Sequence, residues 1–280
     1  MPHVSTLGSS TVDTALDAAV DLLRGGRFAI LTGAGVSTDS GIPDYRGEGA
    51  PVRQPMTVQQ FLADERSRKR YWAGSHLGWR RFDGARPNAG HLAIAGLEAD
   101  GLLDGVVTQN VDGLHLKAGS QHVVDLHGSM DRVRCLNCGQ MFARTDIAAR
   151  ISAANPWLEA PDAVQLRPDG DVEVREVDAF VIPECTICGG MLKPEVVFFG
   201  EVVPAPKFAA ARALVAGADA LVIAGSSLVV NSGIRLLQVA TRRRLPVIII
   251  NRGETKGDGR ATVKIDGGTS EALVAIRERL

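Results

Sequence analysis

Cysteine is scarce in this sequence, with four residues in a chain of 280. Four cysteines are too few to hold a chain of this length together as a disulfide scaffold. They stand as two C-x-x-C pairs, Cys135 with Cys138 and Cys185 with Cys188. This arrangement favours a bound metal in a reducing compartment. Because 45% of the residues are hydrophobic, we expect the chain to bury a sizeable core of its own.

Excess charge and long apolar runs are also missing. A formal net charge of −1 gives no electrostatic footprint for nucleic acid or an anionic membrane. The one basic cluster, residues 242–244, precedes Pro246 and is expected to be a solvated helix end. No apolar run approaches the roughly 20 residues that span a bilayer, and residues 1–12 lack the features of a secretory signal. We therefore expect a cytoplasmic protein that binds neither membranes nor nucleic acid.

Short apolar runs that end in glycine or polar residues predict buried strands. Six such runs occupy residues 28–31, 106–107, 123–124, 221–224, 247–250 and 263–265. Segments with helical periodicity occupy residues 12–23, 91–97, 208–215 and 234–240. The alternation predicts βαβ units, and hence an α/β fold with a doubly wound, mostly parallel sheet.

Two stretches interrupt this alternation. Residues 131–192 contain both cysteine pairs and an acidic, proline-bearing excursion, in which Val172 and Val174 alternate as in a short edge strand. Residues 48–88 combine aromatic and arginine residues and are expected to be helical. We therefore predict one domain from residues 1–47, 89–130 and 193–280. The helical insertion and the cysteine-bearing module are predicted to form a second, smaller domain.

The two cysteine pairs predict a structural zinc site. Tetrahedral zinc prefers four soft ligands, and each C-x-x-C turn presents two thiolates. Such a site is closed, so it leaves no position for water or substrate. A redox dithiol and ordinary core cysteines are the alternatives. Two matched pairs in one chain favour zinc.

His127 lies eight positions before Cys135, which raises the question of whether it belongs to the metal. Four thiolates already complete a zinc site, so an imidazole is surplus as a ligand. A histidine at a strand end suits a general base, because its ordinary pKa of about 6.5 leaves it largely neutral at pH 7. The residues themselves leave open a histidine that only caps a helix or bonds within the core.

A glycine-rich segment, Gly33 to Ser37, follows the first predicted strand. Glycines at this place allow backbone amides to approach a pyrophosphate. The sixth position of the G-x-G-x-x-G pattern is Thr38, so a simple tight turn remains an alternative. The segment continues as a polar loop through Arg46.

Polar residues also follow three other predicted strands, at residues 109–112, 225–227 and 251–253. Each could be only a turn, since Gly, Ser and Asn often end strands. The carboxyl ends of parallel strands meet at one edge of a doubly wound sheet, which is where such sheets bind ligands. Four such ends in one chain predict a nucleotide-binding crevice.

Taken together, these stretches resemble the sirtuins, which are NAD-dependent protein-lysine deacylases. The matching segments are GAGVSTDSGIPDYRG, TQNVDGLH, LHGSM, the two C-x-x-C pairs, LKPEVVFFGE, AGSSLVV and INRG. Tyr45, the segments PNAGH, YWAG and PDGDVEV, and the long gap between the cysteine pairs are similar to the class II branch. The resemblance implies a Rossmann-like NAD-binding domain and one structural Zn²⁺.

The resemblance also implies roles for individual residues. Those implied to bind NAD are Gly33, Ala34, Gly35, Ser37 and Thr38 at the phosphates; Pro43, Asp44, Tyr45 and Arg46 in a closing loop; Gln109, Asn110, Val111 and Asp112 at the ribose and nicotinamide; and Gly225, Ser226, Ser227, Asn251, Arg252, Gly253 and Thr269 at the adenosine side. The implied catalytic residues are His127, as general base, and Asn110. Val197, Phe198, Phe199 and Gly200 are implied to line an acyl-lysine channel, where the backbone adds a strand to the substrate peptide.

The implied reaction begins when the acyl oxygen attacks the nicotinamide ribose. His127 then takes a proton from a ribose hydroxyl, and the products are nicotinamide, free lysine and O-acyl-ADP-ribose. Three other interpretations stay open: ADP-ribosyl transfer to protein, a binding module that responds to NAD or acyl-lysine without turnover, and a zinc-ribbon nucleic-acid binder. The absence of a basic face disfavours the last of these. Nothing in the sequence indicates the oligomeric state.

One departure from the family pattern bears on the acyl group. Sirtuins that prefer acidic acyl groups carry a tyrosine followed three positions later by an arginine, whereas here Tyr71 is followed by Gly74. An arginine fork is what would hold a carboxylate with two hydrogen bonds. We therefore predict that succinyl and malonyl groups are poor substrates.

Overall fold

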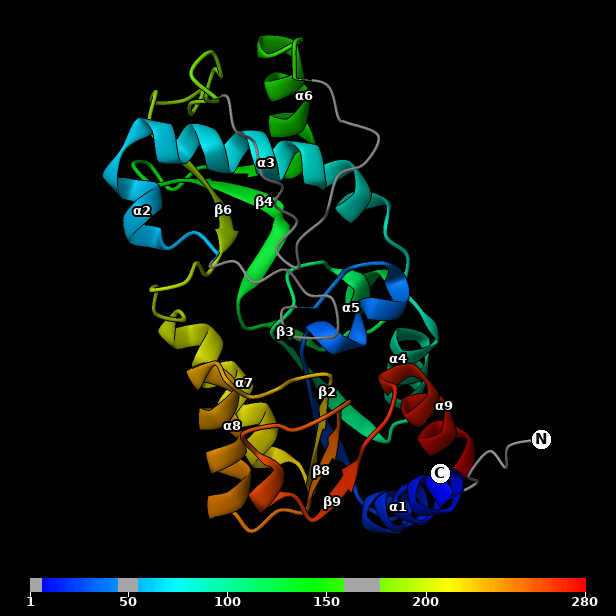
Figure 1. The fold of residues 1–280 in the computed structure, drawn as a ribbon. Coiled ribbons are helices and arrows are strands. Elements are labelled where there is room, and N and C mark those ends of the chain that lie inside the picture. Colours follow the sequence, from blue (N-terminus) through cyan, green and yellow to red (C-terminus); the bar gives the residue numbers. More distant parts are fainter. Residues whose placement is uncertain (1–6, 45–54, 159–176) are drawn as a thin grey trace, which may run out of the picture.

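The computed structural model describes residues 7–44, 55–158 and 177–280. Its larger part is built on a parallel sheet of six strands in the order β3-β2-β1-β7-β8-β9 (Figure 1). The strands are β1 (Phe28–Thr32), β2 (Leu103–Thr108), β3 (Val123–Asp125), β7 (Ala220–Ala224), β8 (Val247–Ile250) and β9 (Val263–Ile265). The chain moves outward from β1 first through β2 and β3, then through β7, β8 and β9. This order confirms the predicted doubly wound sheet.

Helices cover both faces of this sheet. One face packs against α1 (Leu7–Leu23), α4 (Ala89–Ala99) and α9 (Thr269–Arg279), and the other against α7 (Ala205–Gly217) and α8 (Asn231–Arg242). Side chains of a strand alternate between the faces, so Ile30 joins the first core and Leu31 the second. Both side chains are fully buried, as expected for strands covered on two sides.

The predicted helices are confirmed, each extended by several residues. The basic cluster behaves as expected of a solvated helix end: α8 stops at Arg242, and Arg243 and Arg244 are exposed. Arg244 has a φ of 58°, in the left-handed region that commonly ends helices.

The smaller part of the molecule carries a second sheet, which is antiparallel and has the order β5-β4-β6. Its strands are β4 (Gly128–Cys135), β5 (Met141–Ala143) and β6 (Leu192–Val196). The helix α6 (Arg144–Ala154) follows β5, and it packs in one core with this sheet, α2 (Val58–Ala63) and α3 (Glu65–Gly84). The predicted helical insertion is thereby confirmed. The antiparallel sheet was not expected, because glycine, proline and charged residues interrupt its apolar runs.

Two side chains set the start of the inserted helices. Thr57 caps α2 by accepting a hydrogen bond from the Gln60 amide, and Gln60 reaches back to the Thr57 amide. Asp64 then caps α3 through the amide of Ser67. Such caps satisfy amides that have no partner within the helix, and each contributes about 1 kcal/mol.

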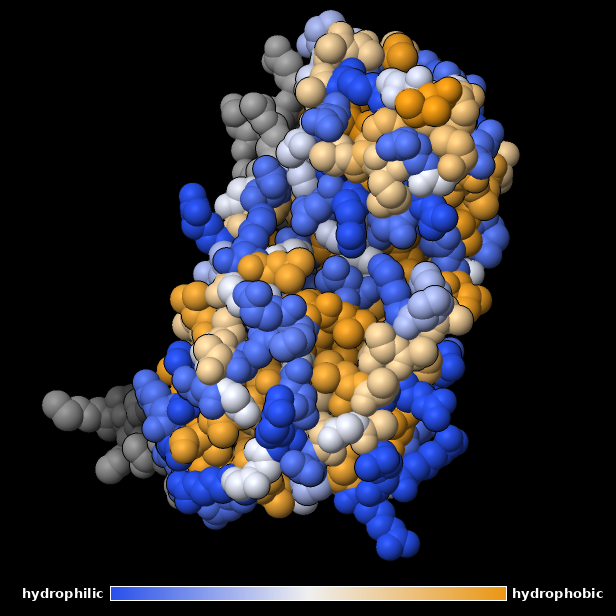
Figure 2. All heavy atoms as spheres, turned by 180° about the vertical axis from the view of Figure 1, so that it is seen from behind, coloured by the Kyte–Doolittle hydropathy of each residue, from blue (hydrophilic) through white to orange (hydrophobic). Residues whose placement is uncertain are grey.

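The proposed edge strand at Val172 and Val174 falls outside the described residues, and the domain boundaries stay a prediction. Among the described residues, no helix combines the length and the apolarity that crossing a membrane requires. On the face opposite to the view of Figure 1, apolar side chains gather in a hollow near the middle, with polar side chains around it (Figure 2).

Candidate active site

The site begins where β1 and β7 end side by side, at the point where the strand order reverses. The amide of Gly33 donates to the Ala224 carbonyl at 3.0 Å, and the amide of Gly35 donates to the Gly225 carbonyl at 2.9 Å. Gly225 has a φ of 63°, and a Cβ atom there would lie 2.5 Å from the Val36 nitrogen. The glycines therefore join two strand ends, a packing role that the sequence analysis did not anticipate.

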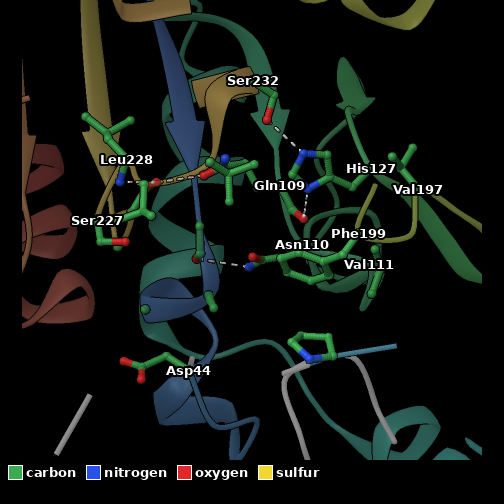
Figure 3. Close-up of a pocket in the computed structure, with 18 of the residues that line it drawn as sticks. Asp44, Gln109, Asn110, Val111, His127, Val197, Phe199, Ser227, Leu228 and Ser232 are labelled. Atoms are coloured by element: carbon green, nitrogen blue, oxygen red, sulfur yellow. Dashed lines mark hydrogen bonds between the residues drawn. The ribbon is translucent and has the colours of Figure 1, made fainter. Parts of the chain in front are cut away.

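A cavity of about 1430 Å³ opens beside this junction. The predicted residues that line it are Gly33, Ala34, Gly35, Thr38, Pro43, Asp44, Gln109, Asn110, Val111, His127, Val197, Phe198, Phe199, Gly200, Gly225, Ser226, Ser227, Asn251, Arg252, Gly253 and Thr269. They come from the segments that follow the six parallel strands and from the loop after β6. Residues far apart in the sequence are thus gathered around one space (Figure 3).

Ser37 and Asp112 are buried behind the cavity wall rather than lining it. The Ser37 hydroxyl donates to Asp112 Oδ2 at 2.7 Å, and the Leu114 amide donates to Asp112 Oδ1 at 2.9 Å. Burial raises the pKa of Asp112, although both hydrogen bonds oppose this. The Asn110 amide nitrogen donates to Ser37 Oγ and to the Gly33 carbonyl, each at 3.1 Å. Ser37 and Asp112 therefore hold Asn110 in place.

Tyr45 and Arg46 lie outside the described residues. Other predicted residues make contacts that stabilise the cavity wall. Thr269 donates its hydroxyl hydrogen to the Gly35 carbonyl at 3.1 Å, which ties the start of α9 to the glycine-rich turn. The Asn251 side chain donates to the Arg252 carbonyl at 2.7 Å and so folds back onto its own loop.

His127 stands at the cavity wall with both ring nitrogens engaged (Figure 3). Nδ1 lies 3.0 Å from the Gln109 carbonyl oxygen, and Nε2 lies 2.9 Å from Ser232 Oγ. Burial lowers the pKa of His127, the Gln109 carbonyl opposes that change, and the positive charge of Lys207 adds to it. The imidazole is therefore neutral at pH 7, which is the form that accepts a proton.

The predicted acyl-channel residues follow β6 and lie beside His127. The Val197 amide donates to the His127 carbonyl at 2.7 Å, and the Phe199 carbonyl accepts from the Val58 amide at 2.9 Å. The Phe198 ring packs against Phe61 and Tyr71, with ring centres 5.2 Å and 5.0 Å away. This aromatic wall makes one end of the cavity apolar.

An ion pair that the sequence analysis did not identify supports this loop. Lys193 is 7% exposed and lies 3.0 Å from Glu201, and its ammonium group also sits 4.5 Å from the Phe198 ring centre. Glu201 in turn accepts a hydrogen bond from the Phe198 amide at 2.6 Å. The ion pair between Lys193 and Glu201 therefore links the two ends of the segment LKPEVVFFGE.

The four cysteines form a separate cluster. All four sulfur atoms lie within 4.8 Å of one another, with Cys135 and Cys188 at 3.6 Å and Cys138 and Cys185 at 3.7 Å. Four bonds of about 2.3 Å at tetrahedral angles place sulfur atoms about 3.8 Å apart, so zinc fits the cluster. A disulfide needs about 2.0 Å. The metal candidates in the described residues comprise these cysteines and not His127.

Several lining residues were not predicted, including Leu228, Val229, Val230, Ser232 and Lys256. They follow Ser226 and Ser227 along the turn that leads into α8, or lie in the loop after β8. Ser226 was predicted because it comes just after a buried strand. Counting a few more residues after each strand would have included these positions as well.

Comparison with known proteins supports a common origin for these features. The model of the Sir2 family matches residues 33–232. "NAD-dependent protein deacetylase 1" of Mycobacterium avium (strain 104) is 51% identical over 265 residues, covering 93% of this chain and 94% of that protein. "NAD-dependent protein deacylase Sirt4" of Drosophila melanogaster is 44% identical, covering 90% of this chain and 83% of that protein.

Solved structures agree with the sequence relatives. One described as "Sir2-p53 peptide-NAD+" superimposes with a TM-score of 0.78 at 30% identity, covering 94% of this chain and 97% of that one. Another, described as "Sir2 bound to acetylated peptide", has a TM-score of 0.75 at 28% identity, covering 94% and 97% of the two chains. On the extent of the family match and the identity to its relatives, the chain belongs to the Sir2 family.

Proposed function

We propose that this chain is an NAD-dependent protein-lysine deacylase in which His127 acts as the general base. The proposal rests on one observation: the neutral His127 imidazole lies at the wall of a large cavity. The glycine-rich turn that borders this cavity lies where the strand order of the doubly wound sheet reverses. Relatives named deacetylases or deacylases over most of the chain length support it.

The cavity suits a dinucleotide and a second substrate together. Its volume of about 1430 Å³ exceeds the usual 300–1,000 Å³ of small-molecule sites. Gly33, Gly35 and Ser226 would hold the phosphate and adenosine side, while Gln109 and Asn110 would hold the nicotinamide side. Bound NAD supplies the ADP-ribose that accepts the acyl group and releases nicotinamide.

His127 moves the proton in this scheme. Its Nδ1 hydrogen is committed to the Gln109 carbonyl, so Nε2 is the atom that accepts a proton from a ribose hydroxyl. Asn110 is fixed by its two hydrogen bonds to the glycine-rich turn and Ser37, and so orients the substrate beside that base. A fixed geometry of this kind lowers the entropic part of the barrier.

The acyl-lysine side chain enters from the apolar end of the cavity. Val197, Phe198, Phe199 and Gly200 would line its path, and the peptide backbone would pair with this segment as an added strand. The named proteins with bound acetylated or p53 peptide support a peptide substrate. We also propose a cytoplasmic location, in keeping with reduced cysteines.

Zinc has a structural role in this proposal. A four-cysteine site has no open position for a substrate, and binding energy on the order of 10 kcal/mol would stabilise the antiparallel sheet around it. The cluster holds the end of β4, whose start carries Gly128 next to His127. The metal thereby acts on the site only through the fold.

An acetylated peptide incubated with and without NAD tests the proposal through the peptide mass. We expect loss of the acetyl group only with NAD, together with one nicotinamide per deacetylated lysine. A mass increase on protein with the peptide unchanged would instead select ADP-ribosyl transfer. NAD binding without any turnover would select a binding module.

A further inference from the structure

Ser232 makes a contact with the base that none of the predicted roles explains. It is the second residue of α8, is 6% exposed and lines the cavity. Its Oγ atom lies 2.9 Å from His127 Nε2 (Figure 3). The hydroxyl therefore touches the atom that has to accept the proton.

The direction of this hydrogen bond follows from the other side of the ring. The Gln109 carbonyl can only accept, so the nitrogen that faces it at 3.0 Å, His127 Nδ1, carries a hydrogen. A neutral imidazole then has its lone pair on Nε2. The Ser232 hydroxyl consequently donates to that lone pair.

The position of Ser232 is fixed by the turn before α8. Gly233, the next residue, approaches Gln109 so closely that a Cβ atom would lie 3.1 Å from Gln109 Nε2. Gln109 Oε1 accepts a hydrogen bond of 2.7 Å from Ser226, and the Ser226 oxygen accepts from the Leu228 amide at 3.3 Å. The turn is strained at Leu228, with a φ of 55°, which is unfavourable for a residue with a side chain.

These contacts close a ring around the imidazole. Gln109 offers its carbonyl on one side, the α8 turn offers the Ser232 hydroxyl on the other, and the Gln109 side chain binds the same turn. Among the described residues, Lys207 on α7 is the charged group that acts on His127, and its positive charge adds to the lowering of the ring pKa by burial. Burial raises the pKa of Asp125, and the same charge opposes that rise. The tautomer is therefore decided by the Gln109 carbonyl, and the Ser232 hydroxyl adapts to it.

A purely structural role for Ser232 would have a different geometry. Val230 is the N-cap residue of α8, and no side chain caps that helix, so Ser232 is not its cap. Serine inside a helix commonly bonds back to the carbonyl four residues earlier. Here the hydroxyl leaves the helix and faces the catalytic cavity instead.

We propose, resting on the deacylase function above, that Ser232 is a positioning residue that holds the neutral His127 ring in the orientation from which Nε2 accepts the substrate proton. Before reaction, Ser232 donates its hydroxyl hydrogen to Nε2. When a substrate hydroxyl arrives, the Ser232 hydroxyl rotates its own hydrogen away and frees the Nε2 lone pair. The substrate proton then passes to Nε2, and Ser232 Oγ accepts a hydrogen bond from the new N–H. One oxygen thus serves both protonation states, which a side chain without a hydroxyl cannot do.

The test compares Ser232→Ala with Ser232→Thr, which keeps a hydroxyl. The matched control is Thr241→Val in the last turn of the same helix, where the lost hydrogen bond joins only Thr241 and the Leu237 carbonyl. With acetyl-peptide and NAD, we expect Ser232→Ala to lower kcat about tenfold with little change in KM for NAD, as for an interaction used at the chemical step. Ser232→Thr should regain most of that loss, and Thr241→Val should match the unmodified protein.

The pH profile supplies a readout that a merely structural role would not move. Ser232 Oγ bonds both forms of the ring, but the hydrogen bond from the charged N–H is the stronger of the two. Its loss in Ser232→Ala should therefore disfavour protonation and shift the acid limb of kcat/KM to lower pH. An unchanged kcat and acid limb in Ser232→Ala would overturn the proposal. A rise in KM alone, or a loss that Ser232→Thr does not restore, would overturn it as well.

Nitrogen NMR of histidine-labelled resting protein separates this proposal from the deacylase function. We expect the Nδ1–H tautomer at His127 and a lower titration midpoint in Ser232→Ala, whether or not any acyl group is removed. If the spectra are as expected but the unmodified protein shows no turnover, the deacylase function is rejected and the Ser232–His127 hydrogen bond still stands. An Nε2–H tautomer, or identical midpoints in both proteins, would reject the role of Ser232.

Discussion

His127 Nδ1 lies 3.0 Å from the main-chain carbonyl oxygen of Gln109, which comes from the end of the neighbouring strand β2. This one contact sets the tautomer of the ring, because a carbonyl accepts and never donates. It also shows why the base lies next to the residues predicted to contact ribose: Gln109 and Asn110 are adjacent in the chain.

Activity should persist below the ordinary pKa of histidine. Burial lowers the pKa of His127, and the base has to be neutral to act, so activity is lost only when the pH falls below that lowered value. We expect the acid midpoint of kcat/KM to lie below about 6.5, the ordinary histidine value. Initial rates between about pH 5 and 8 measure it, and a midpoint above 6.5 would contradict a buried base.

The sheet was predictable from the sequence because its strands are continuous apolar runs, such as residues 247–250, that are buried on both faces. The antiparallel sheet was not, because a strand such as β4 mixes buried and exposed residues with glycine and arginine. Sequence position indicated that polar residues gather after the strands. It could not indicate that Ser37 and Asp112 lie behind the wall, which depends on how the loops after β1 and β2 meet. Nor could it indicate that Ser232 faces His127, which depends on how α8 packs.

Acetyl-lysine should be preferred over succinyl-lysine. Gly74 is buried on α3, and Arg144, which lies near Tyr71, packs between the Trp72 and Trp79 rings and donates to the Ser75 carbonyl instead of lining the cavity. A succinyl carboxylate would enter the apolar end without a bidentate partner, a cost of several kcal/mol. We expect kcat/KM to differ by about a hundredfold or more in paired peptides, since each difference of about 1.4 kcal/mol corresponds to a factor of ten. Preference for succinyl would show that Arg144 or another cation reaches the acyl group.

Stability should fall in mild acid because of two buried histidines. His91 and His115 are at most 2% exposed with ring centres 4.9 Å apart, and burial lowers their pKa values to about 4 and about 3. Unfolding frees both to bind protons, so their contribution is complete above about 6.5 and is lost as the pH falls toward those values. The unfolding free energy should drop by up to about 1.4 kcal/mol per pH unit for each histidine.

Urea unfolding at several pH values measures this slope. His115→Gln should make it shallower, whatever the change in stability at neutral pH. His122→Gln is the matched control, because the His122 side chain is 75% exposed, in contrast to the buried rings of His91 and His115. Equal slopes in the two variants would show that the buried pair does not control acid stability.

Removal of zinc should unfold the smaller part of the molecule rather than block a chemical step. We expect one zinc per chain by elemental analysis, and a Cys135→Ser variant with less metal, a lower Tm and poor solubility. His127→Ala should retain its zinc. A variant without His127 that loses metal, or a Cys135→Ser variant with full metal content, would contradict the assignment of the four cysteines as the ligand set.

The most direct measurement is turnover and NAD binding in one His127→Ala preparation. The account predicts a fall in NAD-dependent deacetylation of about 10²- to 10⁴-fold, the usual contribution of a general base. NAD should still bind in calorimetry with a Kd changed by no more than about threefold, because a base used at the chemical step adds little to ground-state binding. Deacetylation at the unmodified rate would contradict the account.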